Sequence, residues 1–178
     1  MEADPKKRSE YLEKVEEIPK ENRVYIDESG INKDIIQERA WSKRGKPVQA
    51  KKSGKYYLRT NIISGLVENK SITPLIFYGT CNTEVFNCWV EEVLIKELKP
   101  GQTVILDNVS FHKSPRTKEL IESVGCKILF LPPYSPDLNP IEKFWANMKR
   151  WVKSQMTEAS SLFDTICGFF RKSLIQVN

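Results

Sequence analysis

A stiff, proline-rich loop that runs straight into an amphipathic helix constrains this chain more than any other feature. The segment is LPPYSPDLNPIEKFWANMK, residues 131–149. Each proline in it fixes its own φ angle and disfavours helix in the residue before it, so residues 131–139 are not expected to be helical. Apolar side chains then recur at the i, i+3, i+4 and i+7 spacing of a core-facing helix: Ile141, Phe144, Trp145, Met148, Trp151 and Val152. The loop therefore delivers Glu142 to the first turn of a helix, about 100° from the buried stripe.

Two interpretations of Glu142 are open from this helix alone. Asn139 suits the N-cap and Pro140 the first helical position. Glu142 then has the spacing of a capping box, in which it would only bond the backbone N–H of Asn139. Alternatively, Glu142 belongs to a functional site. Lys149 and Lys153 return to within about 20° of it around the helix axis, which would back a functional carboxylate with two cations.

Two further acids follow short β-prone runs. RVYID, residues 23–27, ends in Asp27, and TVILD, residues 103–107, ends in Asp107. The carboxyl ends of buried strands are where an α/β sheet presents side chains to a ligand, whereas an acid inside a strand needs a partner. A solvated strand end or an Asx-turn would explain either aspartate alone. Together with Glu142, they favour a shared site.

At this point the chain resembles the catalytic domain of the mariner-type superfamily of transposases, in its bacterial insertion-sequence branch. The resemblance rests on YIDESG around Asp27, ILDNVSFHKS around Asp107 and the loop-and-helix segment around Glu142, with 34 residues between the last two acids. It extends over about residues 23–152. It implies an α/β, RNase H-like fold and a catalytic, metal-binding triad formed by Asp27, Asp107 and Glu142. Glu28, next to Asp27, is not a triad position.

The resemblance further implies a metal-dependent DNA endonuclease and strand-transferase that cuts and joins phosphodiester bonds at transposon ends. The expected cofactor is Mg²⁺, as two ions, with Mn²⁺ able to substitute. The chemistry agrees, because two such ions stabilise charge on the attacking and the leaving oxygen together. This hard ion also takes carboxylate oxygens rather than a Cys or His cage. The expected partner is DNA, as transposon ends and target, bound by a homodimer.

Asn108 and His112 are candidates for a supporting role. In the family the second acid is often followed by Asn and then by a histidine, and His112 is the only histidine of this chain. The two side chains could orient Asp107 or contact a phosphate. A lone histidine after a strand is more often an ordinary loop residue, and Asn108 could simply shape the turn that leaves the strand. Both roles therefore stay open.

Positive charge is unevenly distributed. Residues 1–22 hold five basic and seven acidic side chains, which leaves 23 basic against 16 acidic in residues 23–178, a net charge of +7. Residues 39–59 carry many basic side chains with interleaved aromatics and no acid. A solvated hairpin is the alternative, but beside a nuclease site we expect phosphate contacts. The DNA-binding candidates are Lys43, Arg44, Lys46, Lys149 and Lys153.

The remaining patterns predict a mixed sheet. Helices are expected at residues 5–17, 83–98, 114–124 and 160–175. Strands are expected at 23–27, 103–107 and 126–131, with two or three antiparallel strands within 41–78, chiefly at 58–67 and 72–78. Strands that alternate with helices imply parallel pairing through right-handed crossovers. Antiparallel strands first and parallel strands after, with flanking helices, suit an RNase H-like fold and place Asp27 and Asp107 on neighbouring strands.

The amino end departs from the family. Residues 1–22 are predicted to be a charged leader or linker remnant before a catalytic domain of residues 23–178, and they are too short for the helix-turn-helix domains that complete members carry. We therefore expect one product of a split element, with a separately encoded helix-turn-helix subunit, or a truncated or repurposed remnant. A catalytically idle DNA-binding remnant and a host RNase H-like nuclease are the alternative functions.

Two other kinds of protein are disfavoured. The four cysteines show no CxxC pair and no histidine partner at zinc spacing, so reduced thiols are expected rather than a zinc site. No apolar run is long enough to span a bilayer, and the first 22 residues contain no signal-peptide core. We therefore expect a cytoplasmic protein without membrane contact, nucleoid-associated when it binds DNA.

Overall fold

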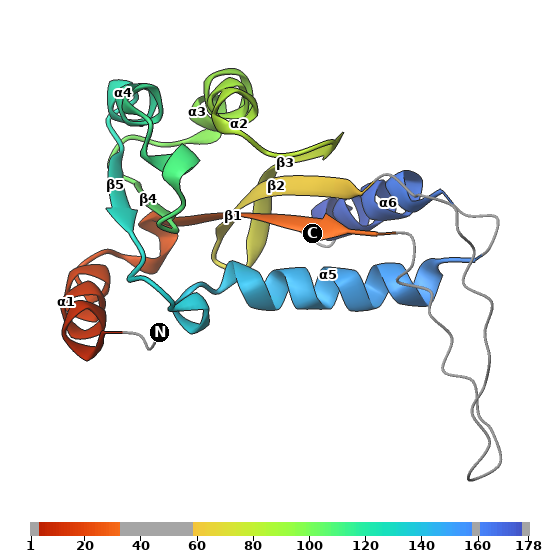
Figure 1. The fold of residues 1–178 in the computed structure, drawn as a ribbon, viewed down its shortest axis with the longest axis horizontal. Coiled ribbons are helices and arrows are strands. Elements are labelled where there is room, and N and C mark those ends of the chain that lie inside the picture. The colour runs from red at the N-terminus through yellow and green to blue at the C-terminus, as the bar shows by residue number, and fades with distance from the viewer. Residues whose placement is uncertain (1–3, 33–58, 158–160, 176–178) are drawn as a thin grey trace, which may run out of the picture.

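The computed structural model describes residues 4–32, 59–157 and 161–175, and its centre is a five-stranded sheet (Figure 1). The strands are β1 (Arg23–Ile31), β2 (Thr60–Val67), β3 (Lys70–Tyr78), β4 (Thr103–Leu106) and β5 (Lys127–Phe130). Their order in space is β3-β2-β1-β4-β5. The β1–β2 and β2–β3 pairs are antiparallel, and the β1–β4 and β4–β5 pairs are parallel. The predicted mixed sheet is therefore confirmed.

Helices cover both faces of this sheet (Figure 1). One face carries α2 (Thr83–Trp89), a π-helical turn (Val90–Leu94), α3 (Ile95–Glu97) and α4 (Pro115–Ser123). The other face carries α1 (Pro5–Glu16), α5 (Ile141–Gln155) and α6 (Leu162–Ile175). The helix predicted at residues 83–98 is thus present, but a wider turn interrupts it.

Strand β1 separates two cores because its side chains alternate between the two faces of the sheet. Val24 and Ile26 pack with residues of α2, α3 and α4, whereas Ile31 packs with residues of α5 and α6. The same period of two places Asp27 on the α5 face and Glu28 on the α2 face. These adjacent acids therefore enter different surroundings.

Strand β1 is longer than the sequence indicated. The prediction ended it at Asp27, but the strand continues because β2 pairs with its second half, as far as Ile31 opposite Thr60. The parallel pairing with β4 ends earlier, at Tyr25 opposite Ile105. Asp27 therefore lies inside β1, two residues beyond the point at which β4 stops pairing with it.

Helix α1 packs onto the sheet and onto the proline-rich loop that follows β5. Tyr11 and Val15 are buried in one cluster with Leu131, which follows β5. The Arg8 guanidinium donates two hydrogen bonds to the Asp137 carboxylate, at 2.9 and 2.6 Å. The predicted leader thus contacts the proline-rich loop, and a domain boundary after residue 22 remains a prediction.

Two further features bear on the class of protein. Within the described ranges, no helix is both long enough and apolar enough to cross a membrane. All four cysteines are free thiols, of which Cys126 is buried and Cys88 is exposed.

Candidate active site

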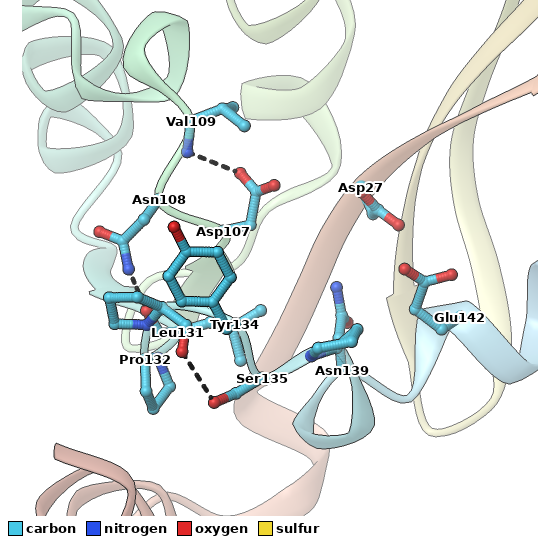
Figure 2. A pocket seen from close by; sticks show the side chains of 12 residues that line it. Asp27, Asp107, Asn108, Val109, Leu131, Pro132, Tyr134, Ser135, Asn139 and Glu142 are labelled. Atoms are coloured by element: carbon cyan, nitrogen blue, oxygen red, sulfur yellow. Dashed lines mark hydrogen bonds between the residues drawn. The ribbon is translucent and has the colours of Figure 1, made fainter. Parts of the chain in front are cut away.

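One pocket of about 500 Å³ is lined by the three acids singled out from the sequence (Figure 2). Asp27 enters it from β1, Asp107 from the residue after β4, and Glu142 from the first turn of α5. The other lining residues come from the end of β4 and from the proline-rich loop: Asn108, Val109, Leu131, Pro132, Pro133, Tyr134, Ser135, Pro136 and Asn139. Side chains that are far apart in the sequence therefore share one hollow.

The register of the sheet explains why two of the acids meet. Tyr25 and Ile105 form the last parallel pair between β1 and β4. Asp27 and Asp107 each lie two residues beyond that pair. The register therefore brings both acids to the same end of the β1–β4 pair, where Asp27 contacts Trp145 of α5 and Asp107 contacts His112.

The start of α5 brings in the third acid. The helix begins at Ile141, one residue later than predicted, with Pro140 as its N-cap. Asn139 does not cap it, because its buried Oδ1 has no hydrogen-bond partner in the described structure. The backbone N–H of Asn139 donates to the carbonyl of Pro136 at 3.0 Å. The prediction of Asn139 as N-cap was therefore wrong.

The same contact removes the capping-box interpretation of Glu142. The backbone N–H that its carboxylate would accept is already bonded to Pro136. The Glu142 residue is exposed and lines the pocket, and Figure 2 shows its carboxylate turned toward Asp27. Glu142 therefore lines the pocket from the first turn of α5 and does not cap that helix.

Asp107 is held as an anion. Its Oδ1 accepts a hydrogen bond from the backbone N–H of Val109 at 3.1 Å and lies 2.6 Å from Nδ1 of His112. Burial opposes ionisation, but these two hydrogen bonds and the positive charges of His112 and Lys113 outweigh it. The pKa of the Asp107 carboxyl therefore lies below its usual range. The same two hydrogen bonds also fix the orientation of the carboxylate.

His112 connects Asp107 to a second acid. The histidine is 1% exposed, and its Nε2 lies 2.9 Å from Oε1 of Glu28. Burial lowers the pKa of His112, but the hydrogen bonds and negative charges of Asp107 and Glu28 raise it to about 9. In the charged ring both nitrogens donate, one to each carboxylate. An ordinary loop histidine does not fit this burial.

Asp27 has the opposite surroundings. Its Oδ2 accepts a hydrogen bond from the indole N–H of Trp145 at 3.1 Å. Burial, followed by the negative charges of Glu28, Glu142 and Asp107, raises the pKa of the Asp27 carboxyl to about 7. At neutral pH this carboxyl is therefore close to half protonated.

Sequence reasoning missed two contacts, that of Trp145 with Asp27 and that of Glu28 with His112. Trp145 was assigned only to the apolar stripe of α5, although a buried indole N–H usually finds an acceptor. For Glu28 the available signal was strand alternation, which puts it on the same face as Val24 and Ile26. An acid on that apolar face needs a partner, and the sequence contains one histidine, His112.

The remaining candidates have different positions. Asn108 lines the pocket and its side-chain amide donates to the carbonyl of Leu131, which ties the ends of β4 and β5 together. Lys149 is half-buried and Lys153 is exposed on α5. The other DNA-binding candidates lie outside the described residues: Lys43, Arg44 and Lys46.

The donor atoms in the pocket suit a hard divalent cation. Within the described residues, no three His, Cys, Asp or Glu side chains are already grouped closely enough to hold one metal ion. The pocket nevertheless carries three carboxylates whose mutual repulsion contributes to the raised pKa of Asp27, and a cation would relieve that repulsion.

Comparison with known proteins gives this arrangement a family. The chain is 27% identical over 161 residues to the Transposable element Tcb2 transposase of Caenorhabditis briggsae, a match that covers 82% of this chain and 57% of that protein. The chain thus spans little more than half of that relative's length. Its fold matches the Mos1 transposase paired-end complex with left transposon end, with a TM-score of 0.71 and 14% identity over 100% of this chain and 57% of that one.

It also matches the mariner Mos1 paired end complex with Mg, with a TM-score of 0.71 and 14% identity over 97% of this chain and 54% of that one. The sheet order and flanking helices are thus those of an RNase H-like fold, as predicted. A family model described as DDE superfamily endonuclease matches residues 22–163, which include all three acids. The chain therefore belongs to the DDE superfamily of endonucleases.

Proposed function

We propose that this chain is the catalytic part of a transposase, a Mg²⁺-dependent DNA endonuclease and strand-transferase that acts at transposon ends. The observation that carries the proposal is the pocket in which Asp27, Asp107 and Glu142 meet on a DDE endonuclease fold. The relatives support it, since one is named a transposase and the other fold matches are transposase complexes with a transposon end or with Mg.

In this proposal the three carboxylates hold the metal. Asp27, Asp107 and Glu142 supply hard oxygen ligands, and two bound Mg²⁺ ions would stabilise charge on the attacking and leaving oxygens of the phosphodiester. Asp107 is ready for this role because its ligand atoms are already charged and oriented. His112 is a positioning residue, since its proton holds Asp107 and it does not line the pocket itself.

Cations around the pocket would contact the DNA backbone. Lys149 and Lys153 follow Glu142 along α5 and would bind phosphates of the strand that leads into the hollow, as would Lys43, Arg44 and Lys46. Such contacts add affinity without sequence preference. Recognition of specific ends would come from a helix-turn-helix unit, and a homodimer would hold two ends together.

Substitution of Asp107 tests the proposal. Asp107→Asn keeps the size of the side chain and its bond to Val109 but removes a hard anionic ligand. We expect Mg²⁺-dependent nicking of supercoiled plasmid DNA to fall on the order of a thousandfold. DNA binding should stay near that of the wild type or become stronger, because one negative charge is removed. Nicking is measured over a Mg²⁺ titration, with an RNA–DNA hybrid as a second substrate.

Asp164→Asn is the matched control. Asp164 is exposed in the first turn of α6 and is not among the residues that line the pocket, so the same chemical change there should leave nicking unaltered. Equal nicking rates for the Asp107→Asn variant and an active wild type would contradict the proposal. Cleavage of the hybrid in preference to duplex DNA would indicate a host RNase H-like nuclease instead.

A further inference from the structure

The wall of the pocket opposite Glu142 carries an exposed aromatic ring. Tyr134 lines the pocket and is 64% exposed. Figure 2 shows its ring on the same side as Asp107 and Asn108, across the hollow from Glu142. The metal chemistry proposed above does not use this side chain, so its exposure next to the acids calls for another explanation.

The backbone at Tyr134 is unfavourable for a tyrosine. Its φ angle is 55°, in the left-handed region. It follows Pro133 in a turn, at the position where a positive φ normally selects glycine or asparagine. A bulky residue held in such a conformation points to a functional requirement for its side chain.

The loop around Tyr134 restricts the backbone that carries the ring. Pro132 and Pro133 restrict the chain before it, and Pro136 restricts the chain after it. Ser135 is 3% exposed, and its Oγ donates to the carbonyl of Pro133 at 3.2 Å. The backbone at Tyr134 is therefore restricted, so that less conformational entropy is lost when a ligand packs against its ring.

The lining of the pocket around this ring combines two kinds of chemistry. The three carboxylates mark where a cation-bound phosphate would lie. Apolar side chains line the same pocket as the Tyr134 ring: Val109, Leu131, Pro132, Pro133 and Pro136. A ligand that matches both kinds of chemistry needs an anionic group and a flat apolar group a short distance apart, and a nucleotide has both.

We propose that Tyr134 stacks on an unpaired base of the DNA strand whose phosphodiester lies at the acids. The inference rests on the proposed function, since it takes the nucleic acid to be oriented by that chemistry. Bases inside a duplex are covered on both faces by their neighbours, so only a frayed or extruded base offers a face to the ring. Stacking on an aromatic ring accepts any base. The subsite therefore selects an opened DNA end and not a sequence.

A binding cycle with an abasic nucleotide tests this contact. Three DNA hairpins are compared by fluorescence anisotropy, with Ca²⁺ in place of Mg²⁺ so that no bond is cut: one with a fully paired end, one with unpaired terminal bases, and one with abasic sites at those unpaired positions. We expect the wild type to bind the unpaired end about tenfold more tightly than the abasic one, from the usual contribution of one base–aromatic stack.

Tyr134→Asn removes the ring and leaves a residue that tolerates the left-handed backbone, so the loop should keep its shape. In this variant the preference for bases over abasic sites should disappear, whereas Tyr134→Phe should retain it. Tyr78→Ala is the matched control, because Tyr78 is 55% exposed on β3 and is not among the residues lining the pocket.

Three results would overturn the inference: no preference in the wild type, an unchanged preference in Tyr134→Asn, or loss of the preference in Tyr134→Phe, which would indicate a hydroxyl contact. Because the readout is binding without cleavage, it separates this inference from the proposed function. Loss of the base preference in Tyr134→Asn beside intact Mg²⁺-dependent nicking by the wild type supports both. A base preference in a protein that never nicks DNA supports the stacking contact alone.

Discussion

Asp27 and Asp107 each lie two residues beyond the last pair between β1 and β4, but their carboxyls have opposite electrostatic surroundings. Asp107 receives hydrogen bonds from Val109 and His112, and the pKa of its carboxyl is lowered. Asp27 receives one from the indole of Trp145 and one from the backbone of Glu28, but burial and like charge outweigh them, so that the pKa of its carboxyl is raised to about 7. The Asp107 carboxylate is thus already ionised before a cation binds, whereas the Asp27 carboxyl becomes fully ionised as a cation binds.

The difference follows from the two faces of the sheet. His112 lies in the core on the α2 face and reaches both Asp107 and Glu28. Asp27 points to the α5 face, where the indole N–H of Trp145 is neutral and cannot offset the negative charges nearby. Removal of charge should therefore affect the two sides differently, which gives two predictions for the metal-free protein.

The largest effect is expected for Asp27→Asn. The folded pKa of Asp27 is raised from 3.8 to about 7, so its ionisation destabilises the fold increasingly between about pH 4 and pH 7. A difference of about three pKa units corresponds to up to about 4 kcal/mol. Above pH 7 the variant should be more stable than the wild type by up to that amount, and the difference should vanish near pH 4. Urea unfolding in EDTA at several pH values measures it.

The control for this prediction is Asp164→Asn on α6, which should change the stability little at any pH because Asp164 is exposed. A loss of stability in Asp27→Asn at pH 8 would show that the charged carboxylate is well accommodated, and the contrast between the two aspartates would then be wrong.

A smaller effect on stability is expected for His112→Gln. The folded pKa of His112 is raised from 6.5 to about 9, so the stability that it contributes is fully present below about pH 6.5 and is lost as the pH rises toward 9. The shift corresponds to about 3 kcal/mol. His112→Gln should be less stable than the wild type at pH 6, and its stability should change less between pH 6.5 and 9. The pH dependence of unfolding in EDTA checks this.

Glu28→Gln sharpens the result for His112. The amide keeps an acceptor for Nε2 but removes one of the two charges that raise the pKa of the histidine. The stability loss should then begin at a lower pH than in the wild type. An identical pH profile in all three proteins would mean that His112 carries no charge in the fold.

Local patterns in the sequence predicted the parts of the fold that local forces determine. The apolar run of β4 and the apolar stripe on α5 are visible in the local sequence, so Asp107 and Glu142 were placed nearly correctly. The length of β1 depends on pairing with β2, more than 28 positions along the chain, and no local signal marks where such pairing ends. Asp27 was therefore predicted at a strand end and lies inside a strand.

The predicted start of α5 was wrong for a related reason. Asn139 is a good capping residue in isolation, but the 3₁₀ turn at Pro136–Leu138 uses its backbone N–H and fixes the approach to the helix. A preference of one residue was thus overridden by the turn before it. The electrostatic contrast between Asp27 and Asp107 depends on contacts across the sheet and could not be predicted from either motif alone.

The central claim is that Asp27, Asp107 and Glu142 together hold divalent metal, and calorimetric titration of the protein with Mn²⁺ near pH 7 tests it most directly. The account predicts binding by the wild type with release of about half a proton per molecule, because a cation favours ionised Asp27 and that carboxyl is close to half protonated near pH 7. The release is seen as a heat of binding that depends on the buffer. Asp107→Asn should bind at least about tenfold more weakly, and Glu92→Gln, an exposed change on the opposite face, should bind normally. Equal affinity and equal proton release in Asp107→Asn and the wild type would contradict the account.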